Sequence, residues 1–182
     1  AWNHSRPSEV GQRFVLRCQA VDPRDLMRGE YVTLGYEFSN PGPADIKRIS
    51  DEWAELHGKD RGVIGNASYL TLPADTSVYV PLKVDAKGLA SGDGITLKRP
   101  ASGPYLKGYA GSRSFGQLRF GIEAFYVKEG TGNTWEKLRN QGLLVAEIGV
   151  LPDGRAGLVG LRKADQSMTK AVPFHRLEQH FY

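Results

Sequence analysis

The sequence predicts a mostly β fold of the α+β class, a compact barrel-like or sandwich-like domain that carries one helical insertion. Three observations predict it. Short apolar runs alternate with polar residues at a period of two, which is typical of strands. Between these runs lie 22 glycines and 10 prolines, as expected of a turn-rich chain. The length of 182 residues, 40% of them hydrophobic, suits one domain with its own core.

The first quarter of the chain predicts two strands after an irregular start. Residues 1–12 show no periodicity and are expected to be a flexible lead-in to a single domain over residues 13–182. A strand is expected from Phe14 to Ala20, ended by a turn at Pro23. The next strand, over 30–38, places four apolar residues on one face, namely Val32, Leu34, Tyr36 and Phe38.

A helix is predicted inside the stretch 41–74, which reads as an insertion between strands. Apolar residues recur there at spacings of three and four, and Pro43 and Gly58 mark the two ends of the helix. The recurring residues are Ile46, Ile49, Trp53 and Leu56.

The second half predicts further strands, a second helix and a hairpin. A helix is expected over 133–141, capped by Asn133 or Thr134 and stopped at Gly142. Asp153-Gly154 predicts a tight turn between strands at 143–150 and 155–161. The apolar tail that begins at Met168 is expected to pack. The other expected strands cover 77–84, 94–97, 105–110 and 118–127, the last with Phe120, Ile122, Ala124 and Tyr126 on one side.

One internal near-repeat is present. The pattern from Val21 to Leu34 returns 63 residues later from Val84 to Leu97, each time as strand, turn, glycine plus acid, and strand. Two related β-turn-β units explain the repeat, and convergent turn chemistry explains it equally well.

Composition narrows the function classes. The formal net charge is +4, but the lysines and arginines are dispersed, so a nucleic-acid partner is not expected. Cys18 is the single cysteine and is expected to be a buried apolar thiol. No apolar run is long enough to span a membrane. Because the chain starts at Ala1, we expect it to be processed or truncated, with any preceding anchor out of view.

Catalytic and cofactor motifs are not recognisable. The sequence has no Gly-x-Ser-x-Gly elbow, and a Ser/Lys peptidase would need a serine where Arg24 to Met27 stand. The four histidines lack metal-ligand spacing, and the glycine pairs lack the Lys-Ser/Thr of a phosphate loop. We therefore expect no catalytic residues, no metal and no cofactor.

The remaining candidates for a site are polar residues beside Gly29 and in the expected strands over 30–38 and 118–127, where Arg119 and Glu123 are expected to share one face. One interpretation is a buried clasp that fixes strand register, and the other is a groove for a ligand or partner. Tyr105 and Tyr109 share a strand face and fit either an aromatic patch or core packing. The candidates are Arg28, Glu30, Tyr31, Tyr36, Arg119 and Glu123.

The stretch Gly29-Glu30-Tyr31-Val32-Thr33-Leu34-Gly35-Tyr36 resembles the bacterial GDYXXLXY family, with glutamate in place of the aspartate of the motif. Stretches at 100–108, 118–130 and 153–161 are also similar to that family, whereas 41–74 looks inserted. The resemblance implies a small extracytoplasmic domain behind an N-terminal membrane anchor, often encoded near multi-spanning membrane proteins, with no established activity.

Two functions follow as expectations. The first is a non-enzymatic interaction domain on the periplasmic side of the cell envelope, whose partner is an integral membrane or other envelope protein. The alternative is a protein that binds a small ligand or carbohydrate, or a hydrolase, with a shallow cleft near Glu30 and Glu123. That alternative requires Glu30, Glu123 and Tyr105 to converge. The oligomeric state is left open.

Overall fold

The computed structural model describes residues 6–19, 31–58, 64–66, 69–111 and 118–164. Among these, the fold is mostly β, as predicted. The elements in chain order are α1 (Pro7–Val10), β1 (Gln12–Arg17), β2 (Tyr31–Thr33), the 3-10 turn η1 (Glu37–Ser39), α2 (Pro43–His57), β3 (Ile64–Asn66), β4 (Tyr69–Thr71), β5 (Ser77–Val84), β6 (Ala90–Gly92), β7 (Tyr105–Ala110), β8 (Leu118–Arg119), β9 (Ala124–Tyr126), α3 (Gly132–Asn140), β10 (Leu144–Val150) and β11 (Ala156–Lys163).

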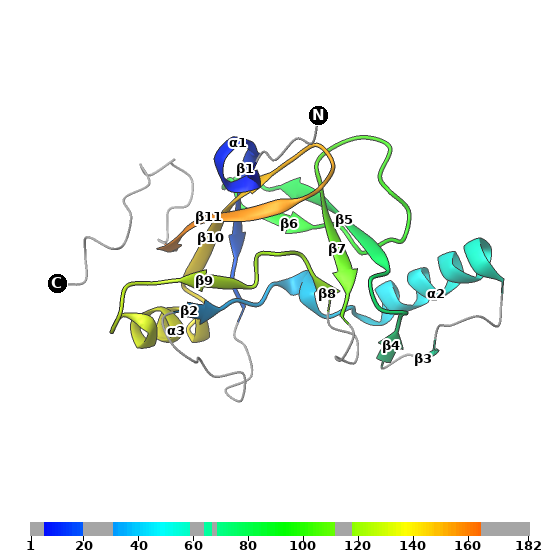
Figure 1. The fold of residues 1–182 in the computed structure, drawn as a ribbon, viewed down its shortest axis with the longest axis horizontal. Coiled ribbons are helices and arrows are strands. Elements are labelled where there is room, and N and C mark those ends of the chain that lie inside the picture. The colour runs from blue at the N-terminus through cyan, green and yellow to red at the C-terminus, as the bar shows by residue number, and fades with distance from the viewer. Residues whose placement is uncertain (1–5, 20–30, 59–63, 67–68, 112–117, 165–182) are drawn as a thin grey trace.

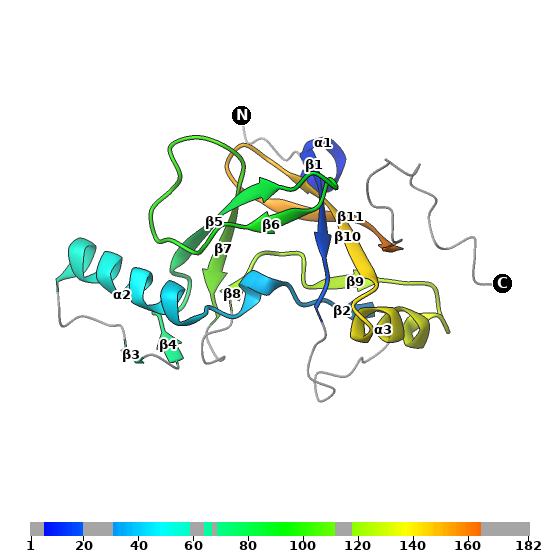
Figure 2. The same ribbon diagram turned by 180° about the vertical axis from the view of Figure 1, so that it is seen from behind.

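One curled seven-stranded sheet forms the body, in the order β11-β10-β1-β6-β5-β7-β8 (Figure 1). Strand β1 lies between β10 and β6 (Figure 2), antiparallel to the first and parallel to the second. The sheet curls back on itself. Its two sides meet where Lys107 N of β7 donates to Gly154 O in the β10–β11 turn at 2.8 Å. The expected barrel-like shape is therefore a half-barrel, beside which β2–β9 and β3–β4 form two short ribbons.

The period-two alternation predicts the core correctly in the first strands. Phe14, Leu16 and Cys18 of the β1 region are all buried. All four apolar residues of the second expected strand are also buried, although only Tyr31–Thr33 is a strand and η1 follows. The pattern thus predicted which face is buried better than it predicted the strand ends.

The expected strand over 118–127 is wrong as a single strand. Gly121 adopts a φ of +81°, which ends β8 and lets the chain turn before β9 begins. Phe120 and Ile122, on either side of Gly121, are buried, but Ala124 is exposed and Tyr126 is 77% exposed. The four residues therefore do not share one buried face.

The two helices and the hairpin form where predicted. Helix α2 begins at Pro43 and ends before Gly58, and Ile46 and Ile49 face the core. It extends away from the sheet at one end of the molecule (Figure 1). Leu56 does not share the buried face with the other recurring apolar residues, because it is 53% exposed near the outer end of that helix.

The β10–β11 hairpin and α3 differ from expectation only in detail. In the hairpin turn Gly154 alone has positive φ, and Leu151 N donates to Arg155 O at 2.9 Å. Helix α3 starts one residue earlier than expected, at Gly132, so the expected cap at Asn133 or Thr134 is wrong and Thr131 is the N-cap. No helix among the described residues is long and apolar enough to cross a membrane.

The expectations for two short segments, 6–12 and 94–97, are wrong. Residues 6–12 are not a flexible lead-in, since α1 packs on β10 and β11 and leads directly into β1. The close fit there depends on glycine, because a Cβ at Gly157 would lie 3.0 Å from Ser8 N. The short strand expected at 94–97 is also wrong: β6 is Ala90–Gly92, and Thr96 forms only an isolated bridge to Tyr79.

Some expectations fall outside the described residues. The first copy of the internal near-repeat includes residues 21–30, so its relation to the second copy stays a prediction. The tail that begins at Met168 lies outside them as well.

Candidate functional site

Three of the six candidate residues can be placed with their side chains. Arg28 and Glu30 lie outside the described residues. Tyr31 begins β2, and only its backbone is described. The other three are Tyr36, Arg119 and Glu123, which come from two segments that the fold brings together.

Tyr36, the last residue of the GDYXXLXY-like stretch, acts as an internal strut. It is 2% exposed, its ring stacks on Phe38, and its hydroxyl donates to Ile122 O at 2.6 Å. Burial raises the pKa of Tyr36 well above its usual value, and the nearby Cys18 and Glu123 raise it further. The phenol therefore stays protonated and serves as a hydrogen-bond donor.

Glu123 holds the bend that follows β8. Its carboxylate accepts the backbone N–H of Phe120, across the positive φ of Gly121. Its backbone carbonyl accepts Leu34 N at 2.6 Å, next to the β2–β9 ribbon. The carboxylate thus holds the bend and the carbonyl joins the bend to the motif stretch, which is the arrangement that the clasp interpretation describes.

Arg119 does not join this cluster. The bend at Gly121 places it on β8, where it is exposed and lies opposite Tyr109 of β7. The expectation that Arg119 and Glu123 share one strand face is therefore wrong, for the same reason that the long strand is wrong.

The aromatic pair also separates. Tyr105 is buried, with its ring 5.7 Å from that of Tyr79, whereas Tyr109 is 42% exposed. Tyr105 packs beside Gly154, while Glu123 bonds within its own bend. Tyr105 and Glu123 thus have different immediate neighbours. Because Glu30 lies outside the described residues, the shallow-cleft alternative stays a prediction.

A buried arginine on α3 escaped the sequence analysis. Arg139 is only 4% exposed, and its Nη1 donates to Thr33 O of β2 at 2.6 Å. Burial raises the pKa of Cys18 to about 12, and the Arg139 charge lowers it only partly, so the Cys18 thiol is protonated and is no nucleophile. The position of Arg139 four residues after the buried Trp135 could have revealed its inward face.

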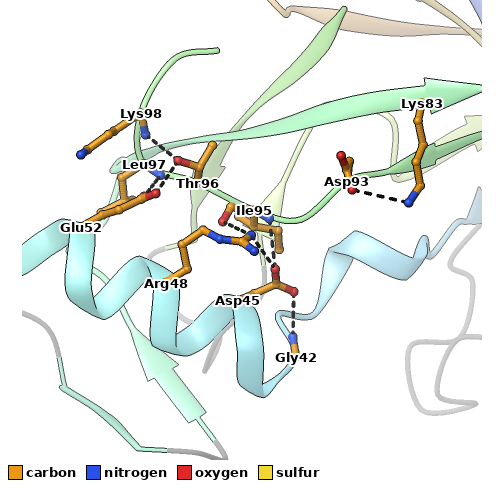
Figure 3. A network of polar contacts seen from close by, with 10 residues as sticks. All are labelled: Gly42, Asp45, Arg48, Glu52, Lys83, Asp93, Ile95, Thr96, Leu97 and Lys98. Carbon is orange, nitrogen blue, oxygen red and sulfur yellow. Dashed lines mark hydrogen bonds and ion pairs between the residues drawn. The ribbon is translucent and has the colours of Figure 1, made fainter. Parts of the chain in front are cut away.

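A second polar network fastens α2 to the chain before β7 (Figure 3). Asp45 accepts Ile95 N at 3.1 Å. About two turns further on, Glu52 accepts Leu97 N at 2.6 Å and the Thr96 hydroxyl at 2.7 Å. Thr96 in turn bridges Tyr79 of β5, so these carboxylates connect the helix to the sheet.

Arg48 of α2 also belongs to this network. Arg48 Nη1 donates to Ile95 O at 3.4 Å, and it lies so close to Gly94, where φ is +80°, that a Cβ there would collide with it. On the exposed side of α2, a shallow depression of about 300 Å³ is lined by Ala44, Lys47, Arg48, Asp51, Glu52 and Glu55. Its lining carries two cations and three carboxylates, and Glu52 is already engaged with the chain before β7.

The described residues contain no group of three His, Cys, Asp or Glu side chains placed to hold a metal ion. The carboxylates of Asp45 and Glu52 and the backbone carbonyl of Glu123 accept backbone N–H groups from segments distant in the sequence. In chemical terms, both networks fix the relative positions of elements.

Comparison with known proteins gives one match. Neither the curated proteins nor the solved structures contain a match to this chain. The model of one family, described as GDYXXLXY protein, matches residues 1–161, which is most of the chain. The resemblance carried by the stretch from Gly29 to Tyr36 is thereby confirmed, and the chain belongs to the GDYXXLXY family.

Proposed function

We propose that this chain is a non-enzymatic interaction domain of the bacterial cell envelope, and that it binds an integral membrane or other envelope protein through the outer edge of β11. The family resemblance supports the extracytoplasmic location and the N-terminal anchor, both of which are part of the proposal. The outer edge of β11 is the observation that carries it.

Strand β11 is eight residues long and stands at one end of the seven-stranded sheet. Of the described strands, it pairs only with β10. Ala164 N donates to Leu143 O at 2.7 Å, so alternate residues donate toward β10, and the N–H groups of Leu161 and Lys163 point to the other side. A partner strand can accept such groups and extend the sheet.

The test compares two substitutions at the exposed Lys163. Lys163→Pro removes the outward N–H without removing a donor to β10, and Lys163→Thr removes the same charge but keeps the N–H. Each tagged variant is expressed in its native envelope, and co-purified membrane proteins are quantified by mass spectrometry.

We expect one envelope protein to co-purify with the unmodified chain and with Lys163→Thr, and to be lost with Lys163→Pro. Thermal unfolding of the purified variants confirms that both still fold. Equal recovery of that protein with both variants, or no envelope protein at stoichiometric level, would refute binding through this edge.

A further inference from the structure

The outer face of β5, β7 and β8 gathers positive charge around one exposed tyrosine. Lys107 and Tyr109 are two residues apart on β7, so their side chains point to the same side of the sheet. Arg119 lies directly opposite Tyr109, and Tyr79 lies directly opposite Lys107. The opposite face of these strands supplies buried core residues, among them Val78, Val80, Leu106 and Leu118.

Loop residues add to this charge from two sides. The Arg99 guanidinium lies 5.8 Å from the centre of the Tyr79 ring. The β10–β11 turn reaches the same place, because Lys107 N donates to Gly154 O at 2.8 Å. That turn brings Arg155, which is paired with Asp153 at 2.7 Å. We call Arg99, Lys107, Tyr109, Arg119 and Arg155 the basic face.

The charges on this face act on one another across elements. Burial alone would raise the pKa of Asp153, but hydrogen bonds and charge from Arg155, together with the Lys107 charge, lower it below its ordinary value. Asp153 thus remains ionised and offsets one of the four cations. The face keeps an excess of positive charge, although the basic residues are scattered in the sequence.

The exposure of the rings favours one kind of ligand. Tyr79 and Tyr105 are each 8% exposed, so their faces are not available to stack on sugar rings or bases. Tyr109 is 42% exposed, and Lys107 Nζ lies 5.5 Å from the centre of its ring. Exposed cations around one amphipathic ring are typical of a surface that rests on lipid headgroups.

We propose that the basic face lies against a membrane and binds the headgroups of anionic phospholipids. The opposite charges provide the attraction, and Tyr109 enters the headgroup layer. This inference is independent of the β11 edge, because the two surfaces use different residues. It would orient an anchored domain with β7 toward the lipid.

The test measures partition of the whole chain onto vesicles of phosphatidylglycerol mixed with phosphatidylcholine, and onto vesicles of phosphatidylcholine alone. The variant is Lys107→Gln with Arg119→Gln. The control is Lys47→Gln with Lys87→Gln, which removes the same charge from α2 and from the β5–β6 turn. Circular dichroism verifies that both double variants fold.

We expect binding only to the anionic vesicles, weakening as salt is added. The variant should lose about 30-fold in partition coefficient, which corresponds to roughly 1 kcal/mol for each cation near the surface. The control should change less than about threefold, since its charges lie off the face.

Three results would overturn the inference: equal binding to both vesicle types, an equal loss in the control, or capture of soluble polyglutamate without vesicle binding. The last result would assign the face to an acidic polymer.

Discussion

Replacing Tyr36 with phenylalanine tests whether the family motif has a structural role. The substitution keeps the ring that stacks on Phe38 and removes only the hydroxyl that donates to Ile122 O at 2.6 Å. Ile122 is fully buried, so its carbonyl loses that donor in a place where water does not readily replace it. An unsatisfied buried acceptor costs about 1–3 kcal/mol of folding stability. For a chain of this size, 2 kcal/mol corresponds to a fall of roughly 4–8 °C in Tm.

The assay is urea unfolding followed by tryptophan fluorescence, with thermal unfolding as a second measurement. We expect the urea midpoint to fall with an unchanged slope, because the native state keeps its compactness. Tyr109→Phe is the matched control, since Tyr109 is 42% exposed and its substitution should stay within about 0.5 kcal/mol of the unmodified chain. If Tyr36→Phe were as stable as that control, the structural role of the Tyr36 hydroxyl would be refuted, and a role for the phenol in binding would have to be considered.

Three other predictions concern the hydrogen bonds by which Glu52 holds α2 to Thr96 and Leu97 (the clamp), the hairpin turn and the buried thiol. Glu52→Gln should lower the free energy of unfolding by about 1.5–3 kcal/mol in urea, because an amide cannot accept both hydrogen bonds that the carboxylate receives. Glu55→Gln breaks only an exposed ion pair and should cost less than about 1 kcal/mol, so equal losses would contradict the clamp. Gly154→Ala should lower Tm more than Gly103→Ala, since both have positive φ but only a Cβ at Gly154 meets a ring, 2.7 Å away. The folded pKa of Cys18 is raised from 9.0 to about 12, so the folded state keeps its proton longer than the unfolded state, and stability falls as pH rises from about 9 to about 12. Cys18→Ala should remove a slope of up to roughly 1.4 kcal/mol per pH unit in that window, and parallel stability curves for the two proteins would refute it.

Local patterns in the sequence predicted local structure well. The strands β5 and β7 have the predicted bounds, and the hairpin and α2 follow from turn and end signals at Gly154, Pro43 and Gly58. Positions that depend on distant partners were not predictable. The break at Gly121 is one example: alternation continues through 118–127, and a glycine can adopt either sign of φ, so the sequence fits both a strand and a bend. The positive φ arises in the fold, where Glu123 O accepts Leu34 N.

The candidate site shows the same division. Tyr36 and Glu123 were chosen as polar residues of the family-like stretches, and the fold brings both to one bend that the sequence did not predict. Asp45 and Glu52 were passed over because an exposed helix face usually carries acids without partners. Their partners lie more than 40 residues further along the chain, and no local pattern indicates that distance.

The two polar networks have a consequence for where function should be sought. Part of the sequence that defines the family is used inside the fold, since Tyr36 and Leu34 bond to the bend at 120–123. Groups engaged in this way are not free to contact a ligand. Family membership therefore specifies a framework rather than a partner, because partners are recognised by sites placed on a fold. In this chain, β11 and the basic face are built from side chains and edges that the framework leaves exposed. Substitutions there should alter binding while stability stays the same, and substitutions at Tyr36 should do the reverse.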